Sequence, residues 1–246
     1  MTVCIGAIAE KSTVISVSDR MLTAGDVEFE PGQAKFWGFS TSIVALISGD
    51  TTIQAEIFNQ VHKETQNWIN ADPAIWINVR DVALLYVQKY RELRRQWAEA
   101  AILHPLGLDI QSFLANQATM ERELVGKIAD KLTEYEFPSV LETIFMGMDN
   151  DGPLSLKGEK LNYPQLFVTE YDRLSCLNTV GFAAIGSGKS HAESQFMFSG
   201  HLAAQAIQRN FVSCLCCEET RGSSSRGWKR YRYDCYWPRT RHRPKG

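Results

Sequence analysis

Strand-forming segments lie on both sides of a long helical middle, and this order constrains the fold of the chain more than any other feature. The first group covers residues 3–9, 13–18 and 42–47, and the second covers residues 141–148, 165–171 and 178–185. Both groups are rich in apolar and β-branched residues and are bounded by turn residues, which is typical of strands. The sequence therefore predicts an α+β protein.

The middle of the chain has the periodicity of helices. Apolar residues recur at helical spacing after Asp50, a preferred N-cap residue, and again over residues 78–103. The segment His104-Pro105-Leu106-Gly107 interrupts this pattern, and residues 110–134 resume it as another helical stretch. A final helix is expected at about residues 190–210. We expect the first two helices to cover one face of the sheet.

Composition restricts the class of protein. With 246 residues and 44% apolar content, the chain is large enough for a proper hydrophobic core. No apolar run approaches the roughly 18 residues of a membrane-spanning helix, and residues 3–9 lack the basic leader of a signal peptide. The five histidines are dispersed without ligand spacing, which argues against a metal-dependent hydrolase. We therefore expect a cytoplasmic protein with no metal, cofactor or membrane partner.

Thr2 directly follows Met1 and opens the first strand segment. Methionine aminopeptidases tolerate a small second residue, so removal of Met1 would expose a threonine with a free α-amine. The reference pKa of that amine is about 7.7–8.0, so part of it is unprotonated near neutrality. One residue would then carry both a nucleophilic hydroxyl and a proton acceptor. The alternative is an ordinary small residue after a start codon.

Five features of the sequence together resemble the proteasome β-subunit family of N-terminal-nucleophile hydrolases, in the family's order and near its spacing. They are the Thr2-Val3 opening, the Ser18-Asp19-Arg20 strand end, Lys35 at the start of a strand, the Ser48-Gly49-Asp50 strand-to-helix junction, and Ala184-Ile185-Gly186-Ser187-Gly188. The resemblance covers roughly residues 2–70 and 141–208. It implies a four-layer αββα sandwich of two antiparallel sheets flanked by helices, a hydrolase domain over residues 1–212, and a helical insertion at about residues 104–137.

The resemblance also implies a role for each site residue. Thr2 would be the nucleophile, Lys35 the nearby cation and Asp19 the carboxylate that pairs with it. The backbone N–H of Gly49 would point at the developing oxyanion, and Ser187 would help to relay protons around the terminal amine. An ammonium beside a hydroxyl and an amine favours the alkoxide and lowers the proton affinity of the amine. These roles are therefore chemically coherent.

The implied function is that of a threonine-type endopeptidase in intracellular protein degradation. Its substrates would be peptides or unfolded proteins, and it would work as a homo-oligomeric ring with an ATP-dependent unfoldase as a possible partner. An alternative is a catalytically inactive structural subunit of such a ring. Taken singly, the site residues also have structural alternatives. Asp19 can be a polar strand end, Lys35 a solvated edge residue, Gly49-Asp50 a helix N-cap, and Ser187 a small turn residue.

A further alternative comes from Gly186-Ser187-Gly188-Lys189-Ser190, which looks like the end of a phosphate-binding P-loop. The full pattern requires a glycine five residues before Gly188, where this chain has Ala183. Only 56 residues follow Ser190, which is too few for the rest of such a nucleotide-binding domain. A P-loop-like nucleotide binder is therefore the less favoured alternative.

The tail, residues 213–246, does not match the family. From Arg209 onward the chain has ten Lys/Arg residues and three Asp/Glu residues, so this part is basic. Four of the six cysteines lie in the tail. One hypothesis is a change of reading frame near residue 212. Cys214, Cys216, Cys217 and Cys235 lack the paired spacing of a zinc ribbon, which disfavours a metal site. Interleaved arginine and aromatic residues can bind single-stranded nucleic acid, but we expect a disordered extension instead.

Overall fold

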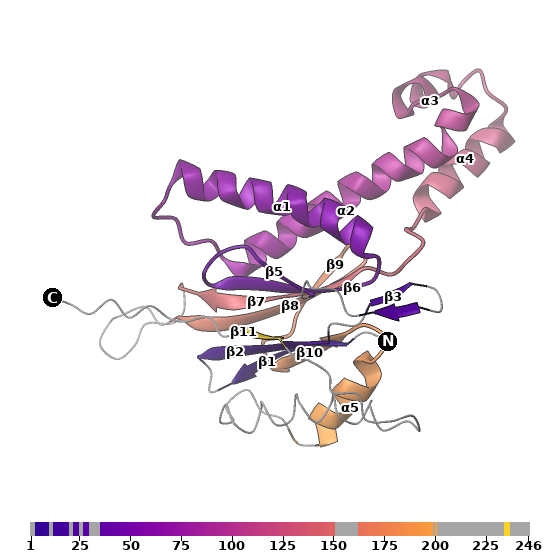
Figure 1. Ribbon diagram of the computed structural model, residues 1–246. Helices are drawn as coiled ribbons and strands as arrows, with labels where there is room; N and C mark the ends of the chain where they lie inside the picture. Colours follow the sequence, from indigo (N-terminus) through magenta and orange to yellow (C-terminus); the bar gives the residue numbers. More distant parts are fainter. Residues whose placement is uncertain are drawn as a thin grey trace.

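The computed structural model describes residues 3–9, 12–19, 22–24, 27–29, 35–150, 162–198, 200 and 234–236. Over these residues the chain is an α+β protein with two main antiparallel sheets, which lie face to face (Figure 1). A small hairpin of β3 (Leu22–Ala24) and β4 (Val27–Phe29) accompanies them. The predicted fold class is thus confirmed at the level of α+β with two antiparallel sheets, and the arrangement is consistent with a sandwich.

The first sheet has the strand order β10-β1-β2-β11, and the second has the order β5-β6-β7-β8-β9. The strands of the first sheet are β1 (Cys4–Ala9), β2 (Thr13–Ser18), β10 (Phe182–Ile185) and β11 (Asp234–Tyr236). Those of the second are β5 (Phe36–Gly38), β6 (Ile43–Ser48), β7 (Glu142–Asp149), β8 (Tyr163–Glu170) and β9 (Arg173–Cys176). Each sheet therefore joins strands from both sides of the helical middle of the chain.

Strand β1 is buried on both faces because its sheet lies in the interior of the layers. Ile5 and Ala7 contribute to the apolar cluster that includes Phe196 of helix α5 (Lys189–Phe198), whereas Cys4 and Ile8 contribute to the cluster between the two sheets. Gly6 lies between them, and a Cβ at this position would come within 2.3 Å of the Met146 side chain of the facing sheet. Glycine at this position therefore permits the close approach of the two sheets.

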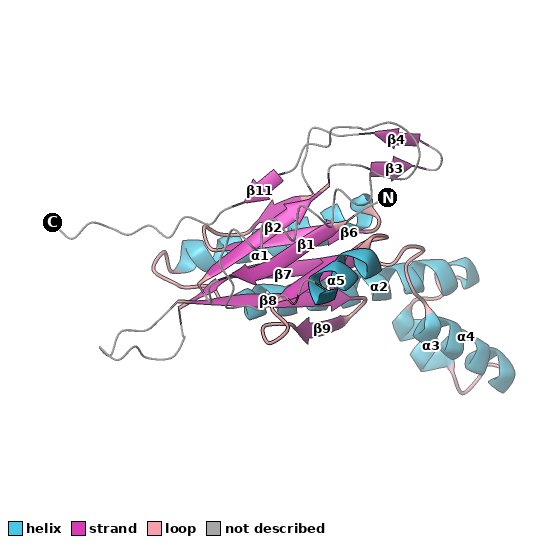
Figure 2. Cartoon of the chain, turned by 90° about the horizontal axis from the view of Figure 1, so that it is seen from below, coloured by secondary structure: helices cyan, strands magenta, loops and turns pink. Residues whose placement is uncertain are grey.

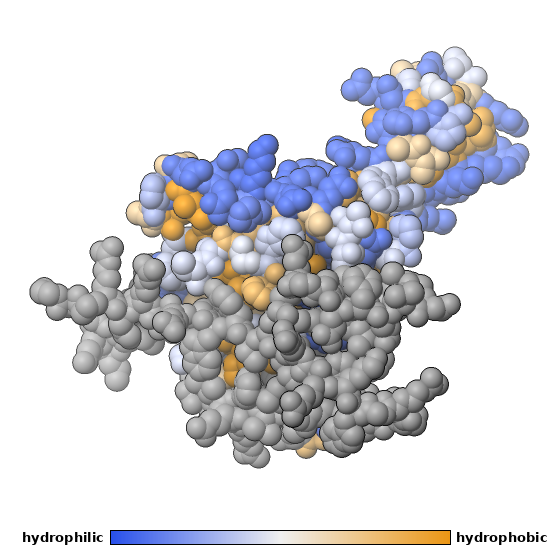
Figure 3. Space-filling model, viewed as in Figure 1, coloured by the Kyte–Doolittle hydropathy of each residue, from blue (hydrophilic) through white to orange (hydrophobic). Residues whose placement is uncertain are grey.

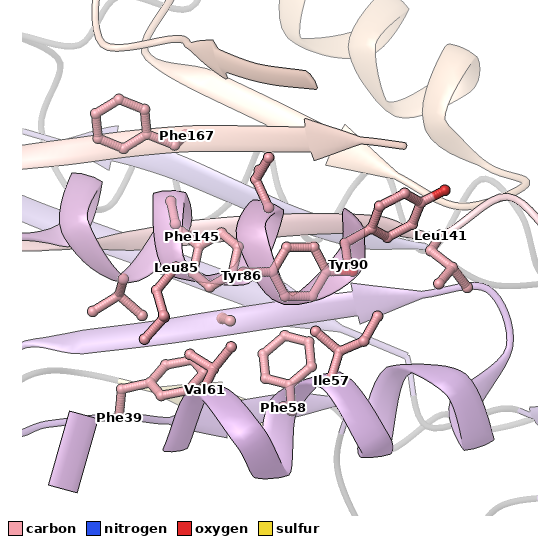
Figure 4. Close-up of a cluster of buried hydrophobic side chains, with 14 of the residues drawn as sticks. Phe39, Ile57, Phe58, Val61, Leu85, Tyr86, Tyr90, Leu141, Phe145 and Phe167 are labelled. Carbon is pink, nitrogen blue, oxygen red and sulfur yellow. The ribbon is translucent and has the colours of Figure 1, made fainter. Parts of the chain in front are cut away.

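Two long helices cover the outer face of the second sheet (Figure 1). They are α1 (Thr51–Ala71) and α2 (Val79–Ile102), close to their predicted positions. Figure 4 shows the aromatic side chains beneath them, where the rings of Phe39 and Phe58 lie 5.5 Å apart and those of Tyr86 and Phe145 lie 5.3 Å apart. The solvent side of these helices is hydrophilic (Figure 3), as expected of amphipathic helices on a sheet.

On the opposite side, α5 (Lys189–Phe198) packs on the outer face of the first sheet (Figure 2). The rings of Phe182 and Phe196 stack there with centroids 4.8 Å apart. The predicted helix extended to about residue 210, but residues 201–210 lie outside the described part of the chain. Among the described residues, no helix has the length and apolarity required to cross a membrane.

Residues 104–134 form a helical arm that extends beyond the sheets (Figures 1 and 2). It contains η1 (His104–Leu106), α3 (Ile110–Asn116) and α4 (Arg122–Glu134). The helical stretch predicted over residues 110–134 is thus observed as two helices with a break between them. Asn116 accepts hydrogen bonds at its backbone oxygen from the Thr119 N–H and hydroxyl, at 3.0 and 2.8 Å, and this local turn replaces the continuing helix.

Two further elements differ from the sequence predictions. Strand β9 was not predicted, because Arg173–Cys176 is a mostly exposed edge segment without the alternation on which that prediction depends. In the tail, β11 pairs with β2 and aligns Asp234 with Ser18. The other residues of 213–246 lie outside the described part of the chain, so the disorder expected for the tail stays a prediction.

Candidate functional site

Asp19 and Lys35 form a buried ion pair in which Lys35 Nζ donates to Asp19 Oδ1. Asp19 directly follows β2, and Lys35 directly precedes β5 of the other sheet, so the pair connects the two layers. Their side chains are only 7% and 5% exposed, respectively. Removing one member would deprive the other of this buried ion pair at a large cost in free energy. The alternative in which Lys35 is a solvated edge residue is therefore wrong.

Asp19 also holds the start of the described chain. Its second carboxylate oxygen, Oδ2, accepts a hydrogen bond of 3.1 Å from the backbone N–H of Val3. In return, the Asp19 N–H donates to the Val3 carbonyl at 3.2 Å. The Val3 nitrogen belongs to the peptide bond that joins Val3 to residue 2. The Asp19 carboxylate therefore bridges the Lys35 ammonium and the first peptide bond after Thr2.

Thr2 itself lies outside the described residues. The predicted pairing of Asp19 with Lys35 is observed, and Thr2, the predicted nucleophile, directly precedes in the sequence Val3, whose N–H donates to Asp19.

Ser187 lies in the turn that follows β10, and it is exposed. Strand β10 pairs with β1 so that Ile185 aligns with Cys4, and the turn therefore follows β10 on the edge where β1 begins. Gly186, with φ of +89°, begins this turn, and its carbonyl accepts from the Lys189 N–H at 2.9 Å. Ser187 is thus at the chain-start edge of its sheet, as the site prediction requires.

Gly49 occupies the junction between β6 and α1. Its φ of +104° is a conformation that L side chains rarely adopt, and a Cβ would come within 2.2 Å of the Val140 carbonyl oxygen. The residue is exposed, and its N–H donates to no other residue in the described part of the chain. Asp50 is indeed the N-cap of α1, accepting from the Thr52 and Ile53 N–H groups at 2.8 and 3.2 Å. Capping by Asp50 leaves the Gly49 N–H available.

Lys35 and the Gly49 junction lie on neighbouring strands. The Lys35 carbonyl accepts a hydrogen bond of 3.1 Å from Ile47, two residues before Gly49. The backbone of the candidate cation is therefore joined to the strand that ends at the candidate oxyanion donor. This bond belongs to tertiary structure and could not be read from the spacing of the two residues.

Glu142 is a site residue that the sequence reasoning missed. It begins β7, aligns with Ser48 in the β6–β7 register, and its side chain is 12% exposed. Its Oε2 accepts from the Gly186 N–H at 2.7 Å, and its Oε1 accepts from Lys189 Nζ at 3.3 Å. Glu142 thereby connects the Gly49 junction with the Ser187 turn. The only sequence signal was a carboxylate at the start of an otherwise apolar strand.

These contacts bear on the phosphate-binding alternative. The Gly186 N–H and the Lys189 ammonium are the groups that would hold a phosphate, and both are bound to the carboxylate of Glu142. Lys189 also lies 3.6 Å from Glu170. Burial lowers the pKa of Lys189, but the charges of Glu142, Glu170 and Glu193 outweigh it, and the pKa is raised overall. The turn is thus neutralised from within the chain, which disfavours phosphate binding.

Within the part of the chain that the structure describes, no three His, Cys, Asp or Glu residues are grouped so that they could hold a metal ion. Cys214, Cys216 and Cys217 lie outside that part, and for Cys235 only the strand assignment is described. The metal hypothesis for the tail therefore stays a hypothesis.

The fold and site define an α+β protein with a buried carboxylate–ammonium pair against the beginning of its first strand. A scan against models of protein families gave no match, and a search of curated proteins gave no relative of this chain. The function is therefore argued from the site geometry and from the motif resemblance.

Proposed function

We propose that the protein is a threonine-type endopeptidase of the N-terminal-nucleophile type, with Thr2 as its nucleophile after removal of Met1. The observation that carries this proposal is the hydrogen bond from the Val3 N–H to Asp19, whose other oxygen binds the buried Lys35 ammonium. A buried ion pair has a large desolvation cost. Its hydrogen bond to Val3, the residue after Thr2, supports a catalytic role for the pair.

In this mechanism, the Thr2 hydroxyl attacks the carbonyl carbon of a substrate peptide bond, and the free α-amine accepts the hydroxyl proton. The Lys35 ammonium lowers the proton affinity of the amine and favours the developing alkoxide, while Asp19 fixes the position of Lys35. The Gly49 N–H donates to the oxyanion. The proton passes to the leaving amine, and water then hydrolyses the acyl-enzyme to release the second product and regenerate Thr2.

The layered arrangement of helices and sheets supports the N-terminal-nucleophile type, because β1 lies between a helical layer and a second sheet. The motif resemblance extends the proposal to peptides or unfolded proteins as substrates. The resemblance also extends the proposal to a homo-oligomeric ring in the cytoplasm that works with an ATP-dependent unfoldase.

The proposal is tested by covalent labelling with a peptide epoxyketone, followed by mass spectrometry of the N-terminal peptide. We expect loss of Met1, one adduct on Thr2, and hydrolysis of a fluorogenic peptide. Thr2→Ala should abolish the adduct and the hydrolysis. Thr133→Ala, which changes an exposed threonine of α4, should retain both. Retained Met1 with no adduct would contradict the proposal and favour the inactive ring subunit.

A further inference from the structure

Gln54 is a fully buried amide in the first turns of α1, and every one of its polar atoms is used. Its Nε2 donates to the Ser48 carbonyl at 3.1 Å and lies 3.4 Å from both the Glu142 carbonyl and Thr143 Oγ1. Its Oε1 accepts from the Tyr86 hydroxyl at 2.9 Å. Side chains of a helix lean toward its N-terminus, so a residue in this turn reaches back over the strand that precedes the helix.

The contact with Ser48 has a geometric consequence at Gly49. The Ser48 carbonyl and the Gly49 N–H belong to one peptide group, and the described residues contain no cis peptide bond. In a trans peptide the C=O and N–H bonds point in opposite directions. The hydrogen bond from Gln54 draws the Ser48 carbonyl toward the buried side of α1. It therefore directs the Gly49 N–H away from the helix.

Glycine makes this peptide plane easy to rotate unless something holds it. Gly49 has φ of +104° and no side chain that could resist rotation. Its N–H has no acceptor among the described residues that would fix it from the other side. The buried amide of Gln54, together with the pairing of Ser48 with Glu142 in the β6–β7 register, thus holds the plane.

We propose that Gln54 is the positioning residue of the oxyanion hole, acting through the Ser48–Gly49 peptide group. This inference rests on the proposed function, in which the Gly49 N–H stabilises the tetrahedral intermediate. Preorganised donors stabilise a transition state because they need no reorganisation during the reaction. Gln54 supplies that preorganisation from the protein interior without touching the substrate.

Tyr86 of α2 sets the orientation of the Gln54 amide. An amide can present either its oxygen or its nitrogen to a neighbour, and the Tyr86 hydroxyl donor selects the oxygen. Burial raises the pKa of the Tyr86 hydroxyl, so this group remains a donor throughout the neutral and moderately alkaline range. The Gln54 NH₂ group is consequently directed to Ser48.

The test compares peptide hydrolysis with inhibition by a peptide aldehyde, whose adduct with a nucleophile carries an oxyanion. The variants are Gln54→Leu, Gln54→Glu and the milder Tyr86→Phe, with exposed Gln111→Leu of α3 as the matched control. Loss of an oxyanion donor costs about 10²–10³-fold in kcat, so a loosened donor should cost about 10–100-fold. We expect the inhibition constant of the aldehyde to rise by a similar factor while KM changes little.

Tyr86→Phe keeps all donors of Gln54 and should give a smaller loss of the same kind, which provides a test if Gln54→Leu does not fold. Unchanged kcat and unchanged aldehyde affinity in the folded variants would overturn the inference. Parallel changes of kcat and KM without loss of aldehyde affinity would also overturn it. In either case the epoxyketone adduct on Thr2 of the wild-type protein would still support the proposed function. A wild-type protein that forms no adduct would overturn both proposals.

Discussion

The carboxylate of Glu142 accepts a hydrogen bond of 2.7 Å from the backbone N–H of Gly186, which lies 44 residues away in the sequence. This hydrogen bond joins β7 of one sheet to the turn after β10 of the other. The same carboxylate holds Lys189, so the turn that carries Ser187 is fixed from both of its ends. Two strands that belong to different sheets therefore meet at one side chain beside the proposed site.

The buried pair of Asp19 and Lys35 predicts a large effect on stability. Asp19→Ala removes the carboxylate that pairs with the buried Lys35 ammonium and should lower the free energy of unfolding by about 3–5 kcal/mol. Glu123→Ala, which breaks the exposed pair of Glu123 with Lys127, should cost no more than about 0.5 kcal/mol. Urea denaturation of the two variants measures both values. Equal losses would contradict the assigned burial of the first pair.

The same pair predicts an effect on activity that is separable from stability. Lys35→Met leaves Asp19 bonded to the Val3 N–H but removes the cation, so peptide hydrolysis should fall by at least about 10²-fold. The double variant Asp19→Asn/Lys35→Met removes both charges of the pair and should unfold at a higher urea concentration than Asp19→Ala. It should remain inactive. A double variant with recovered hydrolysis would exclude the proposed role of Lys35.

Gly49→Ala should destabilise the protein and abolish hydrolysis for two reasons. Alanine is strained at the positive φ of this residue, and its Cβ would clash with the Val140 carbonyl. Two other glycines separate these causes. Gly107 has φ of +71° with open space around its Cβ position, so Gly107→Ala should cost about 1–2 kcal/mol and leave hydrolysis unchanged. Gly126 lies in α4 with open space, and Gly126→Ala should stabilise by about 0.5–1 kcal/mol.

The pKa of Lys189 predicts how the stability contributed by its ion pairs depends on pH. Although burial lowers this pKa, the neighbouring carboxylates raise it above the ordinary value of 10.5. A raised pKa in the folded state gives stability that is fully present below the ordinary value and is lost as pH rises through the raised value. The difference in unfolding free energy between wild type and Lys189→Met should therefore be constant near neutrality and shrink above about pH 10.5. A difference that grows in alkali would contradict this sign.

The helical arm depends on a small core of its own, formed by Leu103, Phe113 and Ile128. Phe113→Ala should remove enough apolar contact to unfold α3 and α4 locally, because so small a cluster has few other buried side chains to stabilise the arm. Hydrogen exchange should show loss of protection over residues 104–134, with peptide hydrolysis retained. Leu114→Ala, at a side chain that is 60% exposed, should leave protection unchanged.

Local patterns were sufficient for most elements of the fold. The apolar spacing after Asp50 and over residues 78–103 predicted α1 and α2, because one helical face must be buried on the sheet. The interruption within residues 110–134 escaped prediction, since the competing hydrogen bonds of Asn116 and Thr119 do not disturb the apolar periodicity. Strand β9 escaped because an exposed edge strand has no hydrophobic alternation to reveal it.

The site followed the same division between local and long-range information. Asp19, Lys35, Gly49 and Ser187 were nominated by the resemblance of their motifs to the proteasome β-subunit family, which depends on residue types and their order along the chain. Folding alone decided that Asp19 binds both Lys35 and Val3, that Glu142 holds the Ser187 turn, and that Gln54 reaches Ser48. Periodicity describes which face of an element is buried, whereas these contacts depend on strand register and sheet stacking between distant segments.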